Sequence, residues 1–258
     1  MVNVAPSLNA VAERAQRFFS PNSARMNELH QEIISPLSEI GEVLIVGGVI
    51  RDLAFYGADE RPISDIDFVV TGRVRQLDLL ADKLGATKNR FGGYGLKRGG
   101  YKIDFWSMHN TWAKVNKFAR VHRPKDMVRT TFFDWDAIVY SVNERNIYAI
   151  PSYIDRLNKR ILDLNLVQNP STKGNLVRAL RRLVMWDARP GRRLGAFLSE
   201  HLDAANWAEI TAAESHAFHV CYLKQFGTSL DFRRKVLART SNFTTGVDSR
   251  RQQSFDFV

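Results

Sequence analysis

The chain has 258 residues, enough for one large domain or two modest ones, each with its own hydrophobic core. Hydrophobic residues make up 45% and charged residues 25%, as in ordinary soluble domains, which argues against a disordered chain or a fibrous repeat. The 37 Lys and Arg residues outnumber the 27 Asp and Glu residues, and the resulting formal net charge of +10 favours polyanionic partners such as nucleic acid or nucleotides.

Neither a membrane span nor a secretory leader is expected. The sequence contains no run of about eighteen apolar residues. Its N-terminus mixes polar and charged residues into the apolar positions and lacks the basic start of a secretory signal. We therefore expect no membrane partner and a cytoplasmic location, while the sequence leaves the oligomeric state open.

The first part of the chain alternates short apolar segments with amphipathic ones. Helical spacing is expected over Asn27–Ile40, with a possible break at Pro36. The expected strands are Val43–Val46, Asp65–Val70, Tyr94–Arg98, Tyr101–Trp106, Ala137–Val142 and Asn146–Ile150. Helices are expected over Ile50–Tyr56 and Gln76–Leu84. This order predicts an α/β (α+β) domain with a mixed sheet.

After Pro151 the pattern becomes helical. Helices are expected over Ile154–Leu162, Asn175–Ala188, Arg192–His201, Asn206–Phe218 and Leu230–Ala238. We therefore expect an α/β domain with N-terminal helices over residues 1–168 and an all-helical domain over residues 169–240. Residues 241–258, rich in Ser, Thr, Gln and Arg, are expected to form a loosely ordered tail.

Three aspartates have the placement of a metal site. Asp65 and Asp67 are two apart on one expected strand, so both carboxylates project from the same face. Asp104 supplies a third carboxylate from another expected strand, whereas the alternatives Asp78 and Asp82 fit the solvent face of a helix. Neighbouring carboxylates repel each other unless a cation bridges them. We expect these three residues to be the catalytic and metal-binding residues of a site for two Mg²⁺ ions, or Mn²⁺, about 3.5 to 4 Å apart.

A glycine pair precedes these acids. Gly47 and Gly48 follow an expected strand, where they let backbone amides approach phosphate groups beside the N-terminus of the next helix. Arg51, just inside that helix, can neutralise the charge of a triphosphate. Together the glycines and acids predict phosphoryl transfer by positioning and electrostatics.

The positive charge is concentrated in one segment. Between Lys88 and Arg129 there are eleven Lys or Arg residues against Asp104 and Asp126, a net charge of +9, with aromatic residues interleaved. Such a segment is either a solvated basic face or a surface that holds phosphates and stacks bases. Beside the glycine and aspartate motifs we favour the second interpretation, with nucleic acid bound by Lys97, Arg98, Lys114, Lys117 and Arg120, of which the last three have helical spacing.

At these motifs the sequence resembles a known family. Val46–Leu53, V-G-G-V-I-R-D-L, is similar to the opening motif of the head domain of tRNA nucleotidyltransferases (CCA-adding enzymes) and bacterial poly(A) polymerases, in the polymerase-β superfamily. Phe133–Tyr140 and Leu157–Leu162 resemble the segments that join that head to its neck. Val177–Leu183, V-R-A-L-R-R-L, resembles the arginine-rich neck helix that reads the incoming base.

The resemblance implies a set of nucleotide-binding residues, with some departures. The base-reading acid of the family is replaced by Asn175, and the family Asn is replaced by Asp136. The basic-acidic pair that the family has before its Phe is absent near Thr131 and Phe132. The implied nucleotide-binding residues are Gly47, Gly48, Arg51, Asp52, Asp136, Asn175, Arg178 and Arg181.

The expected function is that of a metal-dependent, template-independent nucleotidyltransferase. It would add a nucleoside monophosphate from an NTP, or a dNTP, to the 3′ hydroxyl of an RNA or oligonucleotide acceptor. Three alternatives remain open at this point. They are a defence or toxin-type enzyme that modifies tRNA or makes a signalling oligonucleotide, a small-molecule nucleotidyltransferase, and a non-catalytic nucleic-acid-binding module.

Overall fold

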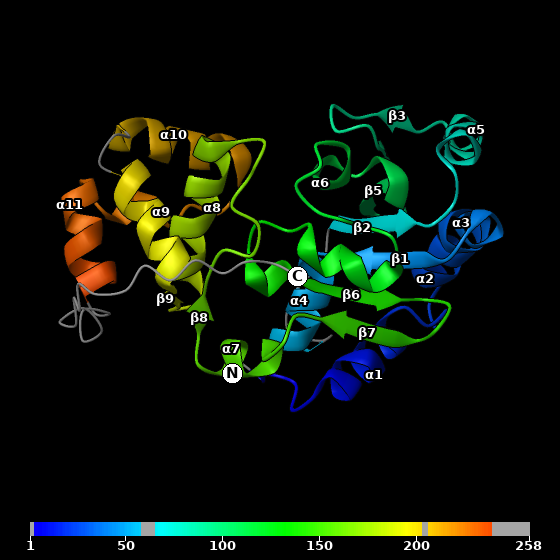
Figure 1. Ribbon diagram of the computed structural model, residues 1–258, viewed down its shortest axis with the longest axis horizontal. Helices are drawn as coiled ribbons and strands as arrows, with labels where there is room; N and C mark the ends of the chain where they lie inside the picture. Colours follow the sequence, from blue (N-terminus) through cyan, green and yellow to red (C-terminus); the bar gives the residue numbers. More distant parts are fainter. Residues whose placement is uncertain (1–2, 58–64, 203–205, 239–258) are drawn as a thin grey trace, which may run out of the picture.

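A mixed β-sheet forms the centre of the N-terminal part of the computed structural model, which describes residues 3–57, 65–202 and 206–238. Helices α8 to α11 lie together on one side of this part (Figure 1). The predicted loosely ordered tail, residues 241–258, lies outside the described residues. Within the described ranges, no helix is long and apolar enough to cross a bilayer.

The sheet has seven strands in the order β3-β4-β5-β2-β1-β6-β7. Only β2 and β5 pair in parallel, and the other neighbours are antiparallel. A separate two-stranded parallel sheet joins β8 and β9. The strands are β1 (Val43–Val46), β2 (Asp65–Val70), β3 (Thr87–Lys88), β4 (Tyr94–Arg98), β5 (Tyr101–Ser107), β6 (Ile138–Ser141), β7 (Asn146–Ala149), β8 (Ile161–Leu162) and β9 (Arg189–Pro190).

Helices flank the sheet and form the C-terminal part. The α-helices are α1 (Leu8–Phe18), α2 (Ala24–Leu29), α3 (Ser35–Ile40), α4 (Gly48–Phe55), α5 (Val74–Leu84), α6 (Trp112–Val115), α7 (Tyr153–Asn158), α8 (Thr172–Met185), α9 (Arg192–Leu202), α10 (Trp207–Ala217) and α11 (Ser229–Phe232). Short 3-10 helices are Met108–Asn110, Pro124–Arg129, Asp134–Asp136 and Leu223–Gln225, and π-helical turns are His30–Ile34 and Arg233–Leu237.

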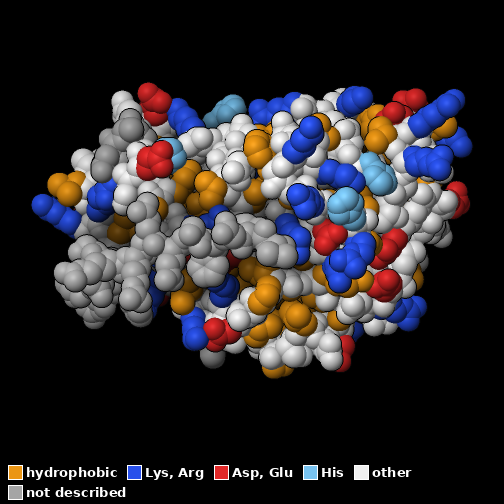
Figure 2. Space-filling model, in the orientation of Figure 1, with side chains coloured by type: hydrophobic (Ala, Val, Ile, Leu, Met, Phe, Trp, Pro, Cys, Tyr) orange, Lys and Arg blue, Asp and Glu red, His pale blue; other side chains and the backbone are white. Residues whose placement is uncertain are grey.

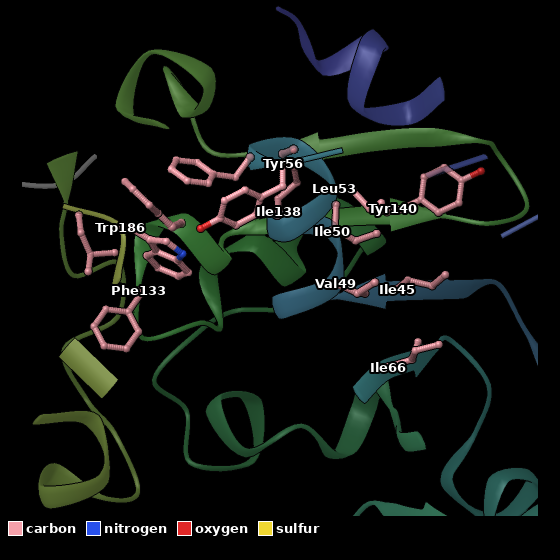
Figure 3. Packing of buried hydrophobic residues seen from close by; sticks show 14 of the residues in the cluster. Ile45, Val49, Ile50, Leu53, Tyr56, Ile66, Phe133, Ile138, Tyr140 and Trp186 are labelled. Atoms are coloured by element: carbon pink, nitrogen blue, oxygen red, sulfur yellow. The ribbon is translucent and has the colours of Figure 1, made fainter. Parts of the chain in front are cut away.

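The alternation of side chains divides the buried residues between the two faces of the sheet. On β2, Ile66, Phe68 and Val70 join the main core, while Val69 joins a smaller cluster on the opposite face. Helix α4 belongs to the main-core side, where Ile50 and Leu53 lie near β1 and β6 (Figure 3). Asp65 and Asp67 alternate with these core residues and therefore lie on the face of the smaller cluster.

Aromatic residues connect the sheet-bearing part to helix α8. Trp186, the residue after α8, stacks on Trp135 with ring centroids 5.0 Å apart and lies 6.1 Å from the ring of Phe55 on α4. All three rings are almost completely buried. Because buried aromatic pairs dominate the energetics of a core, this cluster fixes the C-terminal end of α8 against α4.

Most predicted elements are confirmed, and three segments differ. The expected helix Asn27–Ile40 comprises the end of α2, the π-helical turn and α3, and Pro36 lies in the first turn of α3. The expected helix Ile154–Leu162 ends earlier, because α7 stops at Asn158 and Ile161–Leu162 forms β8, with Arg160 between them at a positive φ of 53°. The expected helix Leu230–Ala238 consists of α11 followed by the π-helical turn. The predicted fold class is confirmed, while the domain boundary at residue 168 stays a prediction.

Candidate active site

A row of paired residues crosses the sheet at the predicted metal site. Asp67 on β2 is paired with Asp104 on β5, and Asp104 is in turn paired with Gly95 on β4. A Cβ added at Gly95 would lie 2.9 Å from Asp104 Oδ1, so the glycine leaves room for that carboxylate. On the other side Asp67 is paired with Val46, the last residue of β1 before Gly47. The backbone register therefore brings the two acids together directly after the glycine motif.

Asp67 is the acid most affected by its surroundings. Burial, together with the negative charges of Asp104 and Asp65, raises the pKa of Asp67 to about 7. Its carboxylate lies near Gly47, where an added Cβ would be 3.5 Å from Oδ2. The mutual repulsion means that Asp65, Asp67 and Asp104 act on each other as one acidic site.

The third acid has a cationic partner from its own strand. Lys102 Nζ lies 3.0 Å from Asp104 Oδ2, and the hydrogen bond with Asp104 raises the pKa of Lys102, keeping it charged. Lys102 is also paired in register with Asp65, so these two residues lie beside the pair Asp67 and Asp104. The three acids Asp65, Asp67 and Asp104 are called the acidic row below. In the described residues no three Asp, Glu, His or Cys side chains are grouped closely enough to hold a metal ion as they stand.

The donor chemistry nevertheless fits a hard divalent cation. Carboxylate oxygens are the ligands that Mg²⁺ and Mn²⁺ prefer. A cation held by Asp65 and Asp67 would neutralise the repulsion that raises the pKa of Asp67. Asp104 would join these ligands once its carboxylate turned away from Lys102.

The glycine pair forms a turn from β1 into α4. Gly47 has φ 72° and ψ −131°, a backbone conformation that favours glycine, and it precedes the first residue of α4 without a side-chain cap. An added Cβ at Gly48 would lie 3.4 Å from Arg51 Nη2, so a larger residue would crowd that guanidinium. The N-terminus of α4 therefore presents its backbone amides beside Asp67, where the helix dipole favours an anion.

Asp136 bridges two arginines in the same region. Its Oδ1 accepts a hydrogen bond from Arg51 Nη1 at 2.5 Å, and its Oδ2 accepts one from Arg182 Nη1 at 2.6 Å. Arg51 also donates from Nε to Asp52 at 2.9 Å. Burial alone would raise the pKa of Asp136, but Arg182 and Arg51 outweigh it and hold the pKa below its ordinary value. This network joins α4 to α8 across the 3-10 helix Asp134–Asp136.

A cleft of about 730 Å³ contains most of the predicted nucleotide-binding residues. The sheet-bearing part contributes the glycine turn and the two acids of β2, and α8 contributes Gly174, Asn175, Arg178 and Arg182. Phe91, Trp106, Trp112 and Phe132 add aromatic walls. The predicted site residues that line it are Gly47, Gly48, Arg51, Asp52, Asp65, Asp67, Asp136, Asn175 and Arg178.

Arg181 is placed elsewhere. It is buried, and its Nη1 donates to Glu214 Oε1 and to the backbone oxygen of Val220, both at 2.6 Å. Its guanidinium also lies 3.8 Å from the centre of the Phe218 ring. Arg181 therefore holds α10 and the following segment against α8. Contrary to the prediction, it does not line the cleft.

The predicted nucleic-acid-binding residues lie outside the cleft. Lys97, Lys117 and Arg120 are exposed, whereas Arg98 pairs with Glu32 at 2.7 Å. Lys114 contacts His109, with 3.2 Å between Nζ and Nδ1. Lys and Arg side chains are spread over the region of β3, β5 and α6 (Figures 1 and 2).

The prediction that Lys114, Lys117 and Arg120 share one face of a helix is wrong. Helix α6 ends at Val115, and Lys117 has a positive φ of 61°. Lys114, Lys117 and Arg120 therefore do not form one helical face, although the segment remains basic.

Lys102 and Arg182 belong to the site but were not predicted from the sequence. Lys102 is two residues before Asp104 on one strand, so the alternation of side chains places both on the same face. Arg182 is four residues after Arg178 on α8, a spacing that puts both on one helical face. Strand and helix spacing could therefore have identified both residues.

Comparison with solved structures supports the fold. No protein-family model matches the chain, and no curated protein matches its sequence. A tRNA nucleotidyltransferase solved with a primer tRNA and an incoming ATP analogue matches with a TM-score of 0.51 and 20% identity, over 76% of this chain and 57% of that one.

Two further structures extend this likeness. A Thermotoga maritima CCA-adding enzyme solved with tRNA matches with a TM-score of 0.56 and 17% identity, over 85% of this chain and 52% of that one. The apo form of a tRNA-processing enzyme matches with a TM-score of 0.53 and 20% identity, over 83% of this chain and 57% of that one. The chain spans slightly more than half of the length of these structures, and its fold is similar to theirs, as its sequence motifs predicted.

Proposed function

We propose that this chain is a metal-dependent, template-independent nucleotidyltransferase. It would transfer a nucleoside monophosphate from an NTP to the 3′ hydroxyl of an RNA or another oligonucleotide. The observation that carries this proposal is the pairing of Asp67 with Asp104 beside the Gly47 turn, at the edge of a cleft that α8 closes from the other side. Carboxylates beside a phosphate-binding helix N-terminus are the parts that nucleotidyl transfer requires.

The triphosphate would lie along the glycine turn and the arginines. Gly47 and Gly48 bring backbone amides to the cleft, and Arg51 places a permanent positive charge directly behind them. Arg182 adds a second guanidinium from α8. Asp65, Asp67 and Asp104 would hold divalent cations, whose chemistry when bound would be to neutralise charge and to lower the pKa of the attacking hydroxyl. The chain itself supplies orientation and charge for the displacement.

The incoming base would lie against α8. Asn175 and Arg178 line the cleft one helical turn apart, and their side chains offer hydrogen-bond donors and one amide acceptor. Trp106, Trp112 and Phe132 supply ring surfaces in the same cleft. An asparagine at position 175 cannot present the acceptor pair of a carboxylate, so we expect one favoured nucleotide or a relaxed choice.

The test is single-nucleotide incorporation. The protein is incubated with Mg²⁺ and each labelled NTP or dNTP, with total tRNA, with a short RNA, or without acceptor. We expect label to join the 3′ end of an RNA. Product formed only without acceptor would favour a signalling-oligonucleotide enzyme, and transfer only to a small molecule would favour the small-molecule class. Ordered C-C-A addition would overturn the interpretation of Asn175 and leave the acidic site intact.

The acidic site is tested by Asp65→Asn and Asp67→Asn. Each variant should lose at least about a hundred-fold in transfer rate, because a ligand of the required cation is removed. Neither should unfold the protein, since each change also removes repulsion within the acidic row. Asp82→Asn, an exposed change on α5 away from the cleft, is the control. Near-normal activity of either site variant at saturating Mg²⁺ would show that the metal site is misassigned.

A further inference from the structure

Lys102 places its positive charge beside Asp104, one of the three acids of the proposed metal site. Its Nζ is 3.0 Å from Asp104 Oδ2, although 57% of the Lys102 side chain remains exposed. A lysine with this much solvent exposure gains little stability from an ion pair, so folding does not require the contact. The position of Lys102 within the acidic row therefore calls for a functional explanation.

The register of the sheet keeps the ammonium group at this site. Lys102 and Asp104 are two apart on β5, and their neighbours on β2 are Asp65 and Asp67. The four side chains therefore project from one face, with three carboxylates and one ammonium group. Gly95, opposite Asp104 on β4, lacks a side chain that would hold this carboxylate away from Lys102.

The charges of this group limit the number of cations that it can hold. Asp65 and Asp67 have no lysine or arginine partner in the described ion pairs, whereas Asp104 is already neutralised. A second divalent cation would need the same Asp104 oxygens and would meet the positive charge of Lys102 only a few ångströms away.

We propose that Lys102 acts as an internal cation at Asp104, so that the protein without nucleotide binds one divalent cation firmly, at Asp65 and Asp67. A second cation would enter only when the Lys102 side chain leaves Asp104. This inference rests on the proposed metal site and adds to it a residue that sets the number of bound ions. The solvent exposure of Lys102 gives its side chain room to move away.

The experiment measures Mn²⁺ binding to the full chain without nucleotide, by electron paramagnetic resonance and by calorimetry. We expect the unchanged protein to bind one ion tightly. Lys102→Met should bind a second ion, or bind it roughly ten-fold or more tightly than the unchanged protein does. Lys102→Arg keeps the positive charge and should retain the single tight site.

Lys97→Met is the matched control. Lys97 is paired with Lys102 across β4 and β5 and is exposed, but no carboxylate pairs with it in the described residues. Its replacement removes the same charge nearby and should leave the number of ions at one. An equal effect of both replacements would overturn the proposal in favour of a general charge effect.

The remaining outcomes separate this inference from the proposed function. Two tight ions in both the unchanged protein and Lys102→Met would overturn the role of Lys102 while supporting the metal site. No Mn²⁺ binding in either protein would overturn the role of Lys102 together with the metal site. One ion in the unchanged protein that is lost in Asp67→Asn, with a second gained in Lys102→Met, would support both.

Discussion

The carboxylate of Asp136 accepts a hydrogen bond from Arg182 Nη1 at 2.6 Å and so joins the sheet-bearing part of the chain to helix α8. The same carboxylate accepts from Arg51 on α4. Arg51 and Arg182 both line the cleft where we propose that the triphosphate binds. Asp136 would therefore compete with a bound triphosphate for these two guanidinium groups.

The first prediction concerns Asp136→Asn. Removing the negative charge leaves two buried arginines without their shared anion, so the free energy of unfolding should fall by about 2 to 4 kcal/mol. The affinity for ATP should rise several-fold, because the guanidinium groups are released for phosphate. Urea unfolding with and without ATP, together with calorimetric titration, measures both effects.

The control for this change is Asp155→Asn. Asp155 forms an exposed i,i+4 pair with Lys159, and its loss should cost less than about 0.5 kcal/mol. If Asp136→Asn unfolded at the same urea concentration as the control and bound ATP no more tightly, Asp136 would not restrain the arginines.

The second prediction is a pH dependence of stability. In the folded protein the pKa of Asp67 is about 7, above its ordinary value of 3.8, so between about pH 4 and pH 7 the folded state binds more protons than the unfolded state. The stability contributed by Asp67 should therefore be fully present below about pH 4, fall as the pH rises through this window, and level off above pH 7. Mg²⁺ should restore stability above pH 7, since it binds the charged carboxylates.

Asp67→Asn removes this contribution and should stabilise the metal-free protein at pH 8. We expect about 1 to 2 kcal/mol, less than the roughly 4 kcal/mol of an unscreened three-unit shift, because Asp67 is half-buried. A weaker slope of the same sign should remain, since burial also raises the pKa of Asp134 to about 7. Unfolding free energies at pH 5 to 8 in EDTA measure the difference, and parallel pH curves for both proteins would contradict the assignment.

The third prediction contrasts two arginines of α8. Arg178→Ala should change stability by less than about 0.5 kcal/mol, because the side chain is exposed, and should reduce incorporation of the preferred nucleotide about ten-fold or more. Arg181→Ala should lower the free energy of unfolding by about 3 to 5 kcal/mol, because it leaves the completely buried Glu214 without its cationic partner.

The two readouts are unfolding by urea and incorporation at a temperature where both variants are folded. Glu214 also accepts the backbone N–H groups of Tyr222 and Leu223, so losing its cation disturbs a whole segment. A large stability loss in Arg178→Ala, or a selective loss of one nucleotide in Arg181→Ala, would reverse the roles that the structure assigns.

The fourth prediction tests the basic segment as an acceptor-binding surface. Replacing Lys114, Lys117 and Arg120 by Gln should weaken RNA binding much more than NTP binding, because these residues lie outside the cleft. The dependence of RNA affinity on salt should also become less steep, by roughly the number of phosphate contacts removed. Filter binding at several salt concentrations measures the slope, with exposed Lys83, Arg17 and Lys224 replaced as the control. Equal slopes for the two triple variants would exclude a specific surface.

The sequence was informative wherever function depends on local spacing. The pairs Gly47-Gly48 and Asp65-x-Asp67 adjoin short apolar runs, so their strands and faces followed from the two-residue period. The third acid, Asp104, was correctly placed on its strand for the same reason. Its alignment with Asp67 depends on strand pairing across 37 positions, which no local pattern reveals.

The roles of the arginines on α8 could not be predicted from the sequence, because they depend on which face of the helix is turned toward the cleft. Spacing alone groups Arg178 with Arg181 as readily as with Arg182, because residues three and four apart both share a helical face. The choice is made by Glu214, a buried acid on α10 that captures Arg181. The helical spacing of Lys114, Lys117 and Arg120 misled for a different reason, since the chain leaves α6 after Val115 and Lys117 adopts a positive φ.

The row formed by Gly95, Asp104, Asp67 and Val46 has a consequence for the accuracy of the site. Its geometry is set by backbone hydrogen bonds between strands, which position side chains more rigidly than a loop does. A slip of one residue between β2 and β5 would turn one acid to the opposite face and separate the pair. Folding the sheet in the correct register and assembling the acidic site are therefore one event, so a misfolded chain of this protein would also be an inactive one.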